Sequence, residues 1–163
     1  MVLWRFWRIF LCGLAKALQA RARGESLPYP SHVVGAPVDF LCTPFDCDIN
    51  LHMNNSVYLR LMDLGRWNYS LRTGVLRYFI ERDLRPVAAR VEITFRKPMP
   101  PFIRFCIDTR VIEVQGKRIV FEQVFWRRRD RAVYARGLVE VAILHDKKVI
   151  DVSMLSHLQE EQF

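Results

Sequence analysis

From Val87 almost to its end, the chain alternates apolar and polar residues with a period of two, and this feature constrains its fold most. A period of two predicts β-strands that have one covered face and one wet face. Gly116 and Asp130 stand at tight connections between consecutive stretches, which favours antiparallel hairpins. The strands predicted in this way cover residues 87–96, 102–115, 118–129 and 132–146.

A helical period precedes the strands. Apolar residues recur at i, i+3, i+4, i+7 and i+11 from Tyr58 to Tyr69, which predicts the buried face of an amphipathic helix. Asn54 or Asn55 is a good N-cap for this helix, and Gly74 marks its end. The sequence therefore predicts one long helix ahead of the strands.

The order of these elements predicts an α+β fold. A strand is predicted at 38–42, and short helical pieces are predicted at 75–82 and 153–161. A single long helix with a strong apolar stripe needs a concave sheet to wrap around it. This arrangement is the hotdog fold, in which a curved antiparallel sheet encloses one central helix. The length of 163 residues suits one such domain.

Charge and cysteine content narrow the classes of partner. Lysine and arginine outnumber aspartate and glutamate by 25 to 17, and the net charge of +8 favours an anionic partner. We find no nucleic-acid-binding motif and no basic helix, so we expect no nucleic acid. The four cysteines form no CxxC pair, and the histidines do not complete a zinc set. We therefore expect no metal, no cofactor and reduced thiols in the cytoplasm.

Residues 1–24 have a composition of their own and predict an additional amphipathic helix, with basic and apolar residues on opposite faces. The longest apolar run, Ile9 to Ala15, is shorter than the roughly 20 residues of a spanning helix. Three interpretations remain: an anchor that binds an anionic membrane peripherally through residues 3–18, a secretory signal, or a helix packed on the domain or on a partner subunit. Residues 25–37 predict a linker, and 38–163 the hotdog domain.

Acidic and polar residues gather just before the long helix. Asp48 is expected near the helix N-terminus, where unpaired N–H groups and the helix dipole favour negative charge. Asp48 is therefore either a structural capping acid or a reactive carboxylate beside N–H groups that hold an oxyanion. Cys47 lies between two acids, which disfavours a thiolate nucleophile. His52 is either a structural residue or a residue that positions Asp48.

The segment DCDINLHMNNSVYLRLMDLGR, at 46–66, resembles the 4-hydroxybenzoyl-CoA thioesterase branch of the hotdog superfamily. The family pattern is D-x-D, then Gly-His-Val-Asn-Asn, then a tyrosine in the helix. The resemblance implies an acyl-CoA thioesterase that works as a homodimer or higher homo-oligomer, with the site between subunits. It also implies that Asp48 is the catalytic carboxylate, as base or nucleophile, and that backbone N–H groups near Asn54 and Asn55 form the oxyanion hole.

The remaining candidate residues follow from the same resemblance. Leu51 stands where relatives often have glycine, so it is expected to alter the loop or to narrow the acyl entrance beside Tyr58. Arg90, Arg96 and Lys97 are candidate contacts for the phosphates of CoA. The alternative function is a non-catalytic, membrane-associated acyl-binding or scaffold protein.

Overall fold

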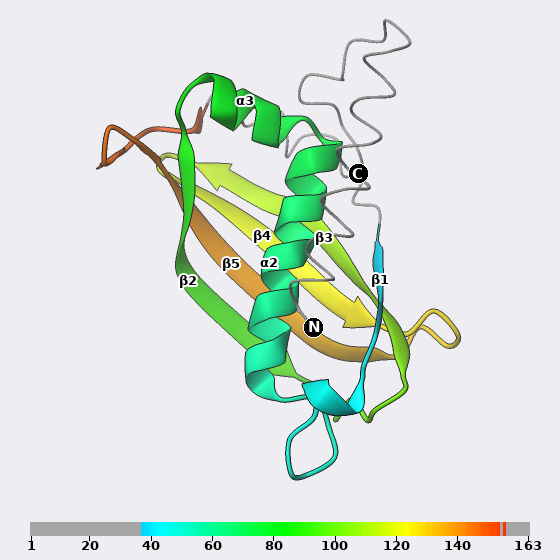
Figure 1. The fold of residues 1–163 in the computed structure, drawn as a ribbon. Helices are drawn as coiled ribbons and strands as arrows, with labels where there is room; N and C mark the ends of the chain where they lie inside the picture. Colours follow the sequence, from blue (N-terminus) through cyan, green and yellow to red (C-terminus); the bar gives the residue numbers. More distant parts are fainter. Residues whose placement is uncertain (1–36, 154, 156–163) are drawn as a thin grey trace, which may run out of the picture.

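The computed structural model describes residues 37–153 and residue 155 (Figure 1). The predicted N-terminal helix, nearly all of the predicted linker, Cys12 and most of the predicted C-terminal helix lie outside the described residues. The described chain forms two α-helices, one short 3-10 helix and a sheet. Their bounds are β1 Val38–Leu41, η1 Pro44–Asp46, α2 Asn55–Arg72, α3 Val75–Glu81, β2 Arg85–Phe95, β3 Arg104–Gln115, β4 Arg118–Trp126, β5 Val133–His145 and β6 Lys148–Val149.

The sheet is antiparallel throughout, with the strand order β1-β3-β4-β5-β2, and β6 adds to β5. Figure 1 shows the sheet curving around α2, which lies across its concave face while α3 covers one end. This is the predicted arrangement of one helix wrapped by a curved sheet, so the predicted hotdog fold is confirmed. The strand β6, the helix η1 and a Cys47–Met53 bridge were not predicted.

The long helix begins and ends where the sequence predicts. The side chain of Asn54 accepts a hydrogen bond from the Ser56 N–H, which makes Asn54 the N-cap. At the other end Gly74 takes a left-handed φ of 77°, which a residue with a Cβ adopts only at a cost. The predicted apolar face is buried against the sheet, and it comprises Tyr58, Leu61, Met62, Gly65 and Tyr69.

A close approach at Gly65 lets α2 touch the sheet. A Cβ at this position would lie 2.5 Å from Gln123 Nε2 and 2.8 Å from Thr109 Oγ1. Gln123 is fully buried, and its Nε2 donates to Met62 O at 2.9 Å and to Thr109 Oγ1 at 3.0 Å. Its Oε1 accepts from Arg66 Nη1 at 2.8 Å. The side chain of Gln123 therefore ties the middle of the helix to the sheet, in space that only glycine leaves open.

The strand β2 is an edge strand with little cover on either face. It pairs only with β5, and every residue of it except Ile93 is exposed. Its exposed residues include Val87, Val91 and Phe95, which are apolar. One covered face was predicted for this strand. Within the described chain α2 packs mainly on β3 and β4 and meets β2 through the contact of Tyr58 with Phe95, so most of β2 remains open.

Candidate active site

A compact loop joins β1 to α2 and carries Asp48. The loop closes on itself because the Asp48 N–H donates to His52 O at 3.0 Å and the Leu51 N–H donates to Asp48 O at 3.1 Å. A bridge between Cys47 and Met53 forms its neck, and the Met53 N–H donates to Met99 O at 2.8 Å. The loop is thus fixed both to itself and to the segment that follows β2.

The two acids of the D-x-D pattern have different surroundings. Asp46 is buried, and its Oδ2 accepts from the Thr43 N–H at 2.8 Å and from the Thr43 hydroxyl at 2.7 Å. These bonds form a capping box for η1, so Asp46 serves the local fold. Asp48 does not share them, which supports the prediction that the two acids do not act as a pair.

Asp48 presents a partly exposed carboxylate. Its Oδ1 accepts from the Asn50 N–H at 2.8 Å and lies 3.3 Å from His52 Nδ1. The described residues place no hydrogen-bond donor on Oδ2. The side chain is 25% exposed and that of His52 is 37% exposed, so a small molecule can reach both. One carboxylate oxygen is therefore held in place while the other remains available.

The N–H groups at the start of α2 are unequally available. The Asn54 N–H donates to Asp46 O at 2.8 Å, and the Ser56 N–H donates to the Asn54 side chain at 2.9 Å. Among the described residues nothing accepts from the Asn55 N–H. Of the two predicted oxyanion donors, the Asn55 N–H therefore has no acceptor among the described residues, whereas Asn54 holds the loop and caps the helix.

Leu51 adopts the backbone conformation that a glycine would favour. Its φ is 57°, in the left-handed region, although it carries a branched side chain. The side chain is 73% exposed and points away from the core. The loop therefore keeps the turn that glycine supplies in the family pattern, and the cost is local backbone strain.

Tyr58 lies in the core beneath the loop. Its ring packs edge-on against Phe95, with centroids 5.1 Å apart, and at a tilt against Phe125, with centroids 4.9 Å apart. Burial, followed by the nearby Cys42, Tyr134 and Cys47, raises the pKa of its hydroxyl to about 12. Tyr58 is therefore a neutral group that supports the helix start in the described chain.

The three basic candidates do not lie together. Arg90 sits in the middle of β2 and pairs with Glu92 at 3.3 Å and Glu140 at 3.6 Å. Arg96 and Lys97 follow the end of β2, where both N–H groups donate to Tyr134 O. Their side chains are exposed, and no acidic partner of theirs is found within residues 37–153 and 155. The segment that they begin reaches Met99, which bonds the loop of Asp48.

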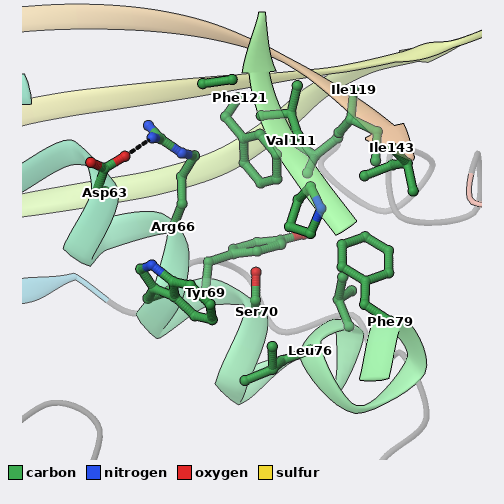
Figure 2. A pocket seen from close by; sticks show the side chains of 15 residues that line it. Asp63, Arg66, Tyr69, Ser70, Leu76, Phe79, Val111, Ile119, Phe121 and Ile143 are labelled. Atoms are coloured by element: carbon green, nitrogen blue, oxygen red, sulfur yellow. Dashed lines mark hydrogen bonds and ion pairs between the residues drawn. The ribbon is translucent and has the colours of Figure 1, made fainter. Parts of the chain in front are cut away.

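A separate apolar cavity of about 140 Å³ lies between the second half of α2, α3 and the sheet (Figure 2). Figure 2 shows Tyr69, Phe79 and Phe121 turned toward it, with the Asp63–Arg66 ion pair at one side. Pro86 and Ala88 of the edge strand β2 complete its lining. No sequence pattern pointed to this cavity, because its walls come from six separate elements.

In the part of the chain that the structure describes, no three His, Cys, Asp or Glu side chains are grouped to hold a metal ion. None of the described helices has the length and apolar character needed to cross a membrane.

A curved antiparallel sheet around one helix, with a carboxylate loop at the start of that helix, defines the hotdog thioesterase class of protein. A family model described as the Thioesterase-like superfamily matches residues 42–160, and the chain belongs to this family. The resemblance seen in residues 46–66 is thereby confirmed at the level of the family.

Individual relatives agree with this assignment. A curated protein from Drosophila melanogaster, Protein THEM6, is 29% identical over 120 residues, which are 73% of this chain and 59% of the relative. The chain spans about half the length of the curated relatives it matches.

Solved structures share the fold. A probable thioesterase from Escherichia coli, YbaW, superposes with a TM-score of 0.71 at 19% identity, covering 76% of this chain and 96% of that one. A mutant of 4-hydroxybenzoyl-CoA thioesterase, in complex with 4-hydroxybenzoyl-CoA, gives a TM-score of 0.69 at 16% identity and covers 78% and 100%. At these identities the likeness speaks for the fold alone.

Proposed function

We propose that the protein hydrolyses an acyl-CoA thioester to a free acid and CoA, with Asp48 as the reacting carboxylate. One observation carries this proposal. Among the described residues Asp48 Oδ2 has no donor and the Asn55 N–H has no acceptor, and both belong to the short segment that leads into α2. Membership of a thioesterase-like family supports the reaction type. Among the described residues, the other acid of the loop is occupied by Thr43.

Two routes fit this arrangement. In the first, Asp48 Oδ2 takes a proton from water as the water oxygen attacks the thioester carbonyl. In the second, Oδ2 attacks that carbonyl and forms an anhydride, which water then cleaves. In both, the Asn55 N–H and the positive end of the helix dipole stabilise the oxyanion, the C–S bond breaks, and CoA leaves as a thiolate that is then protonated.

Arg96 and Lys97 are our candidates for binding the phosphates of CoA. Both side chains are exposed beside the segment that bonds the catalytic loop, whereas Arg90 is engaged with two glutamates. Arginine and lysine are the residues that bind phosphate most strongly in proteins.

A homodimer through β2 would complete the site. An antiparallel, two-fold pairing of strand 85–95 is centred on Arg90, so it places the Pro86 half of one strand beside the Phe95 half of the other. Phe95 touches Tyr58 at the start of α2, whereas Pro86 lines the apolar cavity. The cavity of one subunit would then face the catalytic loop of the other and receive the acyl group.

The size of the cavity suggests a compact acyl group. A cavity of roughly 150 Å³ in another protein binds benzene. The cavity here, at about 140 Å³, suits an aromatic ring or an aliphatic group of similar volume.

Purified protein with Asp48→Asn, measured against a panel of aromatic and aliphatic acyl-CoA thioesters, tests the proposal. We expect the parent protein to hydrolyse at least one thioester of the panel. In the variant kcat should fall by at least about 1,000-fold, because one acid–base group contributes roughly 100- to 10,000-fold to the rate. Asp46→Asn is a poor control because Asp46 caps η1, so Asp146→Asn, exposed in the turn between β5 and β6 and away from the loop and the cavity, serves instead. Acyl-CoA binding without hydrolysis across the panel would favour the non-catalytic alternative.

Single turnover in ¹⁸O-labelled water separates the two routes. A general base directs the label into the released acid alone, whereas label on Asp48 after the first turnover identifies a nucleophile whose anhydride is cleaved by water at the Asp48 carbonyl. Peptide mass spectrometry of residues 46–53 reads the difference.

The phosphate contacts are tested with a shortened substrate. Arg96→Gln with Lys97→Gln is expected to raise KM for an acyl-CoA and to leave KM for the matching acyl-pantetheine thioester, which lacks the nucleotide, unchanged. Arg77→Gln, on the exposed side of α3, is the matched control, and an equal effect of that change would remove the assignment.

We also propose that residues 3–18 bind an anionic membrane surface and hold the domain at the cytoplasmic side of a membrane. The segment lies outside the described residues, and its sequence pattern supports the proposal. Sedimentation with anionic liposomes should fall when residues 1–24 are deleted, and equal sedimentation would refute the anchor.

A further inference from the structure

Two thiols lie side by side beneath the loop of Asp48. Cys42 Sγ and Cys47 Sγ are 3.7 Å apart, and neither is in a disulfide. They are five positions apart in sequence, and both lie near the hydroxyl of Tyr58. The mechanism proposed above uses neither sulfur, so their closeness is a feature without an assigned role.

The two cysteines are held differently. Cys42 follows β1 and is fully buried, and its backbone is fixed because its N–H donates to Ile103 O at 2.9 Å and its O accepts from the Phe102 N–H at 2.7 Å. Cys47 is partly exposed and immediately precedes Asp48. One sulfur is thus fixed to the sheet, while the other belongs to the reactive loop and can meet an oxidant.

We propose that Cys42 and Cys47 form a reversible redox pair that controls the position of Asp48. Hydrogen peroxide oxidises the Cys47 thiol to a sulfenic acid and releases one water. The Cys42 thiol then attacks that sulfur, the S–S bond forms, the S–O bond breaks, and a second water leaves. The two thiols give up two electrons and two protons in total, and a dithiol reductant reverses the change.

Closing the bond moves the loop. An S–S bond is about 2.05 Å long, so the sulfurs must approach by roughly 1.7 Å from their separation of 3.7 Å. Rotation of the two side chains supplies part of this approach. The backbone of Cys47, which precedes Asp48 and is held by one N–H bond to Pro44 O, supplies the rest, because Cys42 is bonded to the sheet through both its N–H and its O. A displacement of about 1 Å at a reacting group costs roughly 100-fold in rate, so the disulfide form is the inactive one. This consequence rests on the proposed thioesterase function.

Cys106 provides an internal control. It is also buried, and its Sγ lies 2.9 Å from Asp39 Oδ1. Burial, followed by the hydrogen bond and the charge of Asp39, raises the pKa of this thiol to about 12. Because Cys106 is buried, and its hydrogen-bond partner is the Asp39 carboxylate and not a second sulfur, it is expected to form no disulfide.

The test uses the full chain with Cys12→Ser, which leaves the three described cysteines. Reduced protein is treated with hydrogen peroxide, quenched and alkylated without reductant. We expect peptide mass spectrometry to find Cys42 linked to Cys47, hydrogen exchange to change at residues 46–53, and acyl-CoA hydrolysis to fall by about 100-fold and recover with dithiothreitol. Cys47→Ser is expected to keep its activity through the treatment, and Cys106→Ser is expected to lose it as the parent does.

The Cys42–Cys47 disulfide and the hydrogen exchange are measured without a substrate. They therefore test the redox pair even if the reduced protein hydrolyses no acyl-CoA and the proposed function fails. Two results overturn the inference. One is the absence of a Cys42–Cys47 link under conditions that oxidise the protein. The other is a linked protein whose exchange at residues 46–53, and whose rate where one is measurable, match those of the reduced form.

Discussion

The contact between α2 and the sheet at Gly65 allows a quantitative prediction for Gly65→Ala. The new methyl group would lie 2.5 Å from Gln123 Nε2 and 2.8 Å from Thr109 Oγ1, and it must displace at least one of them. Overpacking of this kind costs about 1–3 kcal/mol. A buried amide that loses its hydrogen bonds costs about another 1–3 kcal/mol. The better helix propensity of alanine offsets about 1 kcal/mol.

The expected net effect is a loss of about 3 kcal/mol, from midpoints of the two costs less the propensity gain. At about 2–4 °C per kcal/mol for a domain of this size, the melting temperature should fall by about 6–12 °C. Thermal and urea unfolding followed by circular dichroism measure both quantities. Catalytic constants of the folded protein should change little, because Gly65 is remote from Asp48 along α2.

Repeating Gly65→Ala in a protein that already carries Gln123→Ala shows whether the loss of stability comes from the contact with Gln123. With Gln123→Ala the nearest obstacle is gone, and Thr109 is free to rotate because its partner Nε2 is absent. Gly65→Ala should then cost about 2 kcal/mol less than in the parent, within the range of coupling between touching residues. An equal cost in both backgrounds, or a cost below about 0.5 kcal/mol in the parent, would refute the reasoning.

Three further predictions concern the loop, the outer sheet face and the edge strand. Leu51→Gly should be about 1 kcal/mol more stable than Leu51→Ala in urea, because both remove the side chain but only glycine relieves the left-handed φ; equal stabilities would contradict the strain. Burial raises the pKa of the Asp108 carboxyl, and the charge of Arg110 partly opposes this shift. The folded protein therefore binds this proton more tightly than the unfolded chain does. The stability that the bound proton contributes is lost as pH rises through the folded pKa. Asp108→Asn should therefore stabilise the protein at neutral pH and lose that advantage below about pH 4, and a gain that is independent of pH would sink the explanation. Val91→Lys, in the middle of exposed β2, should convert a dimer to a monomer in light scattering, whereas Ile80→Lys on α3 should not; a dimer unaffected by Val91→Lys would exclude this edge.

Periodicity was sufficient to predict the fold, because period two and period 3.6 each report which side of an element is covered. The helix was predicted from its stripe and its asparagine cap, and both agree with the structure. Some strand ends agree and the others differ by up to three residues, since fraying and turn geometry depend on contacts that local pattern does not encode.

The loop could be predicted in outline only. The motif identified Asp48, and the separation of the two acids followed from extended geometry. The structure adds that Asp46 caps η1 and that, among the described residues, the Asn55 N–H has no acceptor. Both depend on which N–H group each oxygen meets in space, which the local sequence does not encode. The same holds for Arg90, whose glutamate partners include one on the neighbouring strand β5.

Features built from distant segments were missed. Gln123 reaches Met62 and Thr109 across three elements, and no local pattern marks a buried glutamine as a tie. The nearness of Cys42 and Cys47 also escaped notice, since a spacing of five residues matches no cysteine motif.

The homodimer proposed through the open edge of β2 would make the stability of this protein depend on its concentration. If two copies pair along this edge, folding and assembly share one equilibrium, and dilution lowers the free energy of unfolding without any change in solvent or temperature. The two halves of the strand differ in their protection. Arg85, Pro86 and Arg90 guard the first half against unwanted pairing, whereas the segment VEITF, at 91–95, carries a single acid. A monomer would therefore be most prone to aggregate through this second half of β2. The proposed pairing with another copy would cover it.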